Sequence, residues 1–190
     1  MLKSTLISML IAIGVILLLV FCAVMIILRY RKLNTLRTRA EETFMYMETY
    51  MKNRHQMIPK FIMYIKRATQ LDTVIMDDVV NARNVACQTK SRDQKVLAEA
   101  ELQRKLNILY NTIRNSTEIE RDEAFDDYLA QMRTVESHVA RTRIAYNEVV
   151  EEYNKAMSGF WSRWVTLMFG FDYEEEFDIE ATALPSEYHL

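Results

Sequence analysis

The pattern of apolar and polar positions separates one unbroken apolar run from several striped segments. Residues 4–28, STLISMLIAIGVILLLVFCAVMIIL, carry no charged side chain. A helix rises about 1.5 Å per residue, so a run of this length can cross a hydrocarbon core of about 30 Å. Only a helix satisfies its own backbone hydrogen bonds inside lipid in this way. The sequence therefore predicts a transmembrane helix.

A cleaved signal peptide is the alternative interpretation of the apolar run. Its apolar region would be about 7–15 residues long and would end in small residues at a cleavage site. Here the run is longer and ends in Ile26, Ile27 and Leu28, followed at once by Arg29. This pattern favours an uncleaved anchor.

The charges that flank the run predict its orientation. Lys3 is the only basic residue before it, whereas five Lys or Arg residues follow between positions 29 and 39. The side richer in Lys and Arg stays in the cytoplasm. For a bacterial-type inner (plasma) membrane, we therefore expect a single-pass protein with a short N-terminus outside and residues 29–190 in the cytoplasm.

Beyond the run, apolar residues recur every three or four positions, as they do in amphipathic helices. No breaker separates the run from the first stripe, so one rod is predicted, with a bend or an end at Pro59. The stripes are Leu33, Leu36, Ala40, Phe44, Met47, Met51, Ile58, Ile62 and Ile65; Ile75, Val79, Ala82 and Ala86; Leu102, Leu106, Leu109 and Ile113; and a last series from Phe125 to Phe160.

Capping residues predict where the later helices begin. Asp72 is positioned to cap a helix that ends near Lys90, and Asp122 to start the last one. Ser91 and Gln94 resemble a capping box, which either opens a third helix or marks a bend within a longer one.

The last stripe is the most regular, and its spacing is typical of a coiled-coil seam. We predict that its buried face comprises Val135, Val139, Tyr146, Val149 and Tyr153. The charged residues of this segment are expected mainly on the other faces: Glu136, Arg141, Glu148, Glu151, Glu152 and Lys155.

Composition limits the fold class. The chain has 3 glycines and 2 prolines, too few for the turns of a sizeable sheet. We expect an all-α fold, in which the transmembrane helix continues into an antiparallel bundle of three to four long helices. The expected domains are an anchor at 1–28, a bundle at 29–171 and an acidic tail at 172–190 that is partly disordered.

No pattern of catalytic residues stands out. The 3 histidines lie far apart, and the common metal, nucleotide and nucleophile motifs are absent from the sequence. Acid clusters such as Asp77-Asp78 usually form solvated faces rather than metal sites. Basic residues without interleaved aromatics do not predict nucleic-acid binding. The sequence thus predicts no enzyme, catalytic residue, cofactor or metal site.

Two groups of residues are candidates for contacts. Tyr146-Asn147 recurs as Tyr153-Asn154, and these pairs either form a polar row for a partner or tie the bundle together. The second group either inserts at the membrane interface or caps one end of the bundle, and it comprises Trp161, Trp164, Phe169 and Phe171.

Four stretches of the sequence resemble the LemA family. They are the N-terminal span, residues 53–61 (NRHQMIPKF), residues 136–154 (ESHVARTRIAYNEVVEEYN) and residues 169–171 (FGF), with Ala82-Arg83 as a weaker feature. Lys60-Phe61 departs from the usual Asn-Leu, and the connection at residues 115–121 is shorter than in the family. The resemblance implies a bacterial single-pass membrane protein with a cytoplasmic helical bundle, and marks Pro59, Tyr146, Asn147, Tyr153 and Asn154 as family-motif contacts. It supplies no catalytic residues.

These patterns favour a membrane-anchored, non-catalytic scaffold or adaptor. Its expected partners are the lipid bilayer, further copies of the chain in a homo-oligomer, and an unidentified membrane protein, with no nucleic acid. The alternatives are a regulatory partner of a membrane peptidase, an enzyme or metal-dependent regulator that uses acidic residues, and a ligand sensor with reversed topology.

Overall fold

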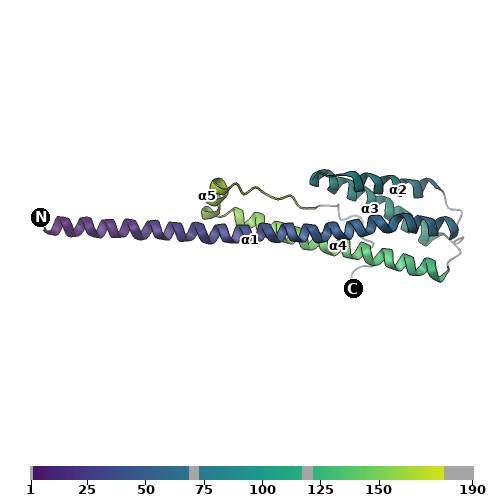
Figure 1. The fold of residues 1–190 in the computed structure, drawn as a ribbon, viewed down its shortest axis with the longest axis horizontal. Helices are drawn as coiled ribbons and strands as arrows, with labels where there is room; N and C mark the ends of the chain where they lie inside the picture. The colour runs from purple at the N-terminus through teal and green to yellow at the C-terminus, as the bar shows by residue number, and fades with distance from the viewer. Residues whose placement is uncertain (1, 69–72, 117–121, 178–190) are drawn as a thin grey trace. The chain divides into compact units, whose positions relative to one another are not determined.

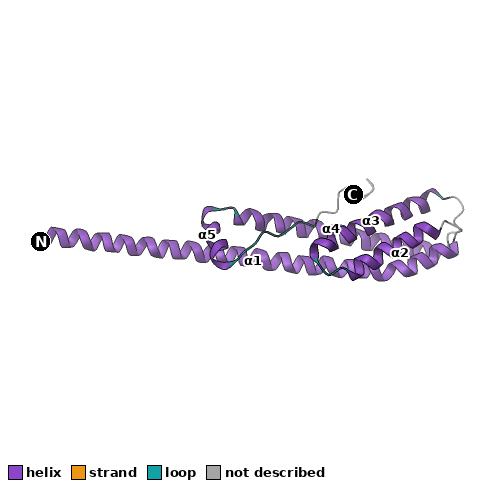
Figure 2. Ribbon diagram, turned by 90° about the horizontal axis from the view of Figure 1, so that it is seen from above, coloured by secondary structure: helices purple, strands orange, loops and turns teal. Residues whose placement is uncertain are grey.

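The computed structural model describes residues 2–68, 73–116 and 122–177 of the chain, and within them it contains helices and no strand (Figures 1 and 2). The helices are α1 (Leu2–Ala68), α2 (Thr73–Gln88), α3 (Arg92–Asn115), α4 (Glu123–Met157) and α5 (Phe160–Phe169). The prediction of an all-α fold, in which the apolar run continues without a break into the first bundle helix, is confirmed.

One compact unit is formed by residues 44–145 with Phe177. Its four helical segments belong to α1, α2, α3 and α4, and consecutive segments run in opposite directions (Figures 1 and 2). The predicted stripes supply the core, including Ile58, Val79 and Leu106, which are fully buried. We call this unit the bundle.

The other compact unit comprises residues 1–43 and 146–176, and we call it the anchor unit. It holds the apolar part of α1, the end of α4, helix α5 and an extended segment. Its core contains Leu33, Leu36, Tyr153, Met157, Val165 and Phe171. Residues 5–21 of α1 are exposed throughout, and α1 is long and apolar enough to cross a membrane.

The helix starts agree with the predicted caps where the structure describes them. Ser91 is the N-cap residue of α3, so the chain breaks there and does not merely bend, although the Ser91 side chain makes no capping hydrogen bond. The Asp122 carboxylate accepts a hydrogen bond from the Phe125 N–H at 2.7 Å, as an N-cap does. Asp72 lies outside the described residues.

The predicted end of the first helix at Pro59 is wrong, because α1 is helical through residue 68, while a bend there stays a prediction. Proline has no N–H to donate to the carbonyl of His55, four residues earlier. That carbonyl instead accepts a hydrogen bond from Nε of Arg83 on α2, at 3.0 Å. Pro59 itself is exposed, so its ring does not disturb the core.

The seam of α4 largely follows the prediction. Val135, Val139, Tyr146 and Tyr153 are buried. Val149 is only half-buried, and Val150 takes the inward position instead. Glu136, expected on a polar face, is 9% exposed because it joins a cluster of charges inside the bundle.

Candidate functional site

A cluster of charged and polar side chains crosses the core of the bundle. Arg54 of α1 is fully buried and donates hydrogen bonds to Glu99 and Gln103 of α3 and to Glu136 of α4. The bonds to Gln103 and Glu136 measure 2.7 and 3.1 Å. Three helices thus meet on one guanidinium, which has the five N–H donors needed for such a role.

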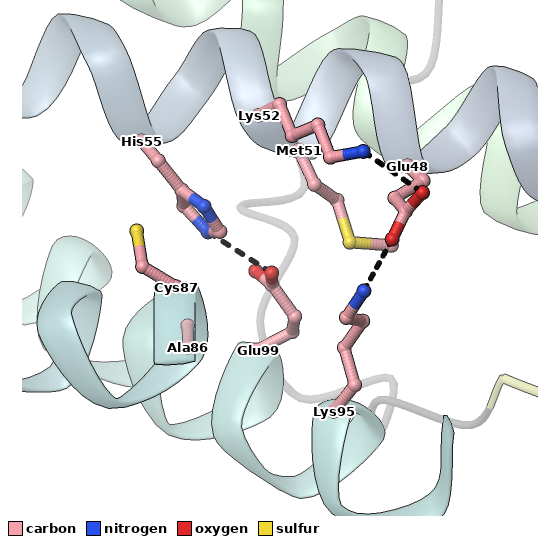
Figure 3. A pocket seen from close by; sticks show the side chains of 8 residues that line it. All are labelled: Glu48, Met51, Lys52, His55, Ala86, Cys87, Lys95 and Glu99. Atoms are coloured by element: carbon pink, nitrogen blue, oxygen red, sulfur yellow. Dashed lines mark hydrogen bonds and ion pairs between the residues drawn. The ribbon is translucent and has the colours of Figure 1, made fainter. Parts of the chain in front are cut away.

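His55 extends the cluster to the edge of the core. Its Nε2 lies 2.9 Å from Oε1 of Glu99, and the two side chains point toward each other (Figure 3). Both face a small cavity of about 50 Å³ between α1, α2 and α3. Lys52 and Lys95 hold Glu48 on the far side of this cavity. We call Arg54, His55, Glu99, Gln103 and Glu136 the Arg54 cluster.

The charges of the Arg54 cluster stabilise one another. Burial alone would raise the pKa of Glu99, but its contacts with His55 and Arg54 outweigh this and hold the pKa below its usual value. Burial alone would likewise lower the pKa of Arg54, but the carboxylates of Glu136 and Glu99 outweigh this and raise the pKa above its usual value. The contacts within the cluster therefore favour the charged forms of Glu99 and Arg54.

The geometry of the Arg54 cluster fits a structural role better than a catalytic one. Glu99 is already engaged by Arg54 and His55, and the adjacent cavity of about 50 Å³ has room for only a few water molecules. Cys87 of α2 also lines the cavity, but its side chain is exposed. Among the described residues, no three acidic, His or Cys side chains gather as metal ligands would.

The tyrosines and the second asparagine of the Tyr-Asn pairs hold the C-terminal segment of the anchor unit. Tyr146 and Tyr153 donate hydrogen bonds to the carbonyls of Glu175 and Asp172, each at 3.0 Å. The Asn154 amide pairs with the backbone of Glu174 in both directions, at 2.8 and 3.1 Å. We call residues 171–176 the strap. The first part of the expected acidic tail therefore packs on α4, and residues 178–190 lie outside the described residues.

The four aromatic candidates divide into two groups. Phe171 is buried in the core of the anchor unit, as a cap would be, and Phe169 packs against Tyr30 with ring centroids 4.8 Å apart. Trp161 instead contacts Phe21 within the apolar run, at 6.2 Å. Trp164 is 53% exposed. These contacts place Phe171 in the core of the anchor unit and Trp161 beside the apolar run, and both roles considered from the sequence stay predictions.

Arg54 and Glu99 were not singled out from the sequence, although a signal for them exists. Arg54 continues the stripe Met47, Met51, Ile58 at steps of three and four, and Glu99 precedes Leu102 and Leu106 in the same way. A charged residue inside an apolar stripe is expected to find a partner. The sequence alone does not show which of these charged residues pair with each other, because the pairing depends on how three helices pack.

These features define a class of protein in which one apolar N-terminal helix continues into a helical bundle. The chain belongs to the LemA family, whose family model matches residues 43–187. The match includes Pro59, both Tyr-Asn pairs and the strap, while the apolar run precedes it. No curated protein matches the chain.

Proposed function

We propose that this protein is a membrane-anchored, non-catalytic scaffold or adaptor that acts through the surfaces of its helices and self-assembles at a bacterial inner membrane. The observation that carries the proposal is the closed state of the Arg54 cluster. Arg54, Glu99 and Glu136 are buried, paired with one another and beside a cavity of about 50 Å³. Enzyme sites are instead clefts of about 300–1,000 Å³ that enclose most of the bound ligand.

The surface of the bundle offers more room than its interior. A shallow, open groove of about 810 Å³ runs between α1 and α4, and it is lined by Asn53, Met57, Asp127, Tyr128, Ala130, Gln131, Thr134 and Val135. Its mixture of apolar and polar side chains resembles ordinary protein–protein contact surfaces. This groove supports a role in protein contacts.

Self-assembly is tested on the full chain, purified in mild detergent and sized by light scattering. We expect a homogeneous assembly of this chain, which Thr134→Arg in the groove reduces in size while helical content stays unchanged. Arg133→Ala, exposed on α4 but outside the groove lining, is the matched control. A monomeric wild-type protein would contradict self-assembly.

An enzymatic role predicts a different result. A conservative variant such as Glu99→Gln would then abolish a cellular function of the protein while fold, amount and membrane localisation stay intact. Under our proposal, any loss of function in this variant is accompanied by loss of stability, since the variant leaves Arg54 without one of its partners.

A further inference from the structure

Helix α5 presents an apolar face that the rest of the described chain leaves uncovered. Phe160 is 73% and Leu167 80% exposed, and Trp164 and Met168 lie on the same side. The opposite side of α5 is packed, because Ser162 and Val165 are fully buried. This helix is thus apolar on two sides, of which only one contributes to the core of the anchor unit.

The uncovered face lies beside the apolar run of α1. Trp161 packs edge-on against Phe21, and Trp164 and Met168 follow Trp161 at helical steps of three and seven. Residues three and seven apart lie on one side of a helix. The uncovered face of α5 is therefore continuous with the exposed apolar surface of α1.

The contacts between α5 and α1 also indicate how deeply α5 would lie in a bilayer that α1 crosses. A hydrocarbon core of about 30 Å needs about 20 helical residues, so a span that starts near Thr5 ends near residue 24. Trp161 reaches the last turn of this span at Phe21, and Phe169 packs on Tyr30 beyond it. Figure 2 shows that α5 runs across the axis of α1 rather than along it. If α1 spans a bilayer from Thr5, a helix in this position would lie near the membrane surface.

We propose that α5 is an interfacial helix, whose face formed by Phe160, Trp161, Trp164, Leu167 and Met168 inserts into the lipid bilayer at the end of the transmembrane span. The residue types fit this layer, because tryptophan is enriched at membrane interfaces and amphipathic helices bury their apolar face about 5–10 Å deep there. Arg163, exposed on the flank of α5, is placed to meet lipid headgroups. The bilayer thus contacts the chain at two elements, and the second fixes how deeply α1 sits.

The test uses the fact that the chain contains 2 tryptophans, both on α5. The full chain is reconstituted into vesicles of phosphatidylcholine and phosphatidylglycerol, as wild type and as Trp161→Phe and Trp164→Phe. Each variant leaves one tryptophan, whose fluorescence is quenched either by aqueous iodide or by lipids brominated at defined depths. Circular dichroism checks that the variants keep their helical content.

We expect blue-shifted emission from Trp164, strong quenching by lipids brominated near the headgroup end of the acyl chains, weaker quenching by bromine near the methyl end, and little quenching by iodide. Strong iodide quenching without quenching by brominated lipid would overturn the proposal, since the face would then be in water. Protection from both quenchers would also overturn it, because a second copy of the chain would then cover the face. Neither result depends on whether the protein is a scaffold.

Discussion

Pro59 and Arg83 act together although they lie on different helices. Proline leaves the carbonyl of His55 without its helical donor, and the guanidinium of Arg83 supplies a replacement at 3.0 Å. A buried carbonyl without a donor costs about 1–3 kcal/mol. The continuity of α1 through Pro59 is therefore coupled to the packing of α2.

This coupling predicts a non-additive pair of substitutions. Arg83→Met should destabilise the bundle by about 1–3 kcal/mol, because the His55 carbonyl loses its donor. In the Pro59→Ala background the loss should be smaller, since the backbone N–H that alanine restores at this position can bond to the same carbonyl. Chemical unfolding of the four proteins measures the cycle. Equal losses in both backgrounds would show that Arg83 does not serve this carbonyl.

Glu99 gives the bundle a predictable dependence on pH. Its pKa is lower in the folded protein than the usual value of 4.5, so its stabilising contribution is present above about pH 4.5 and is lost as the pH falls through the folded pKa. Glu99→Gln should destabilise the bundle by about 3–5 kcal/mol near neutral pH, because Arg54 remains buried.

Thermal unfolding of both proteins between pH 7 and pH 3 measures this contribution. The difference between wild type and Glu99→Gln should shrink as the pH falls below 4.5. Glu151→Gln, which changes an exposed pair with Lys155, should leave the unfolding temperature nearly unchanged throughout. A difference that stays constant with pH would mean that folding does not lower the pKa of Glu99.

At the scale of helices, the sequence predicts the periodic buried faces but misses contacts that depend on one distant residue. The stripes of α1, α3 and α4 recur over many turns, so their buried faces were predictable from spacing alone. At Pro59 the donor to the His55 carbonyl is Arg83, a single residue on another helix, and local rules cannot include it. The strap has no periodicity, since it is held by side chains of α4 that bond to its backbone.

The turn from α5 into the strap depends on one glycine. Gly170 ends α5 with a φ of 66°, and its N–H donates to the Thr166 carbonyl at 2.9 Å. This left-handed conformation costs other residues about 1–2 kcal/mol. We therefore expect Gly170→Ala to weaken the seating of Phe171 and the strap, although a Cβ at this position would meet nothing within 4 Å.

Hydrogen exchange at the strap measures this effect. In wild type the Glu174 N–H is protected by its bond to Asn154, and both Gly170→Ala and Asn154→Ala should speed its exchange. Lys155→Ala, a neighbouring and exposed position, is the control that should leave exchange unchanged. Unchanged protection in Asn154→Ala would show that the side-chain amide does not hold the strap.

At the scale of the whole molecule, the family and the helical fold agree with the sequence, while orientation in the membrane rests on the distribution of charge. The chain carries 2 cysteines, which make orientation measurable without added labels. Cys87 is exposed on α2 of the bundle, whereas Cys22 belongs to the apolar run and is shielded by lipid if that run spans the membrane.

We expect Cys87 to face the cytoplasm, because five Lys or Arg residues between positions 29 and 39 follow the apolar run and one Lys precedes it. A maleimide that cannot cross membranes should leave the protein unlabelled in intact bacterial cells and label it once the inner membrane is opened. Cys87→Ser should abolish this label, which assigns it to the bundle rather than to Cys22. Labelling of Cys87 in cells with an intact inner membrane would place the bundle outside the cytoplasm and would favour a sensor of external ligands over a cytoplasmic scaffold.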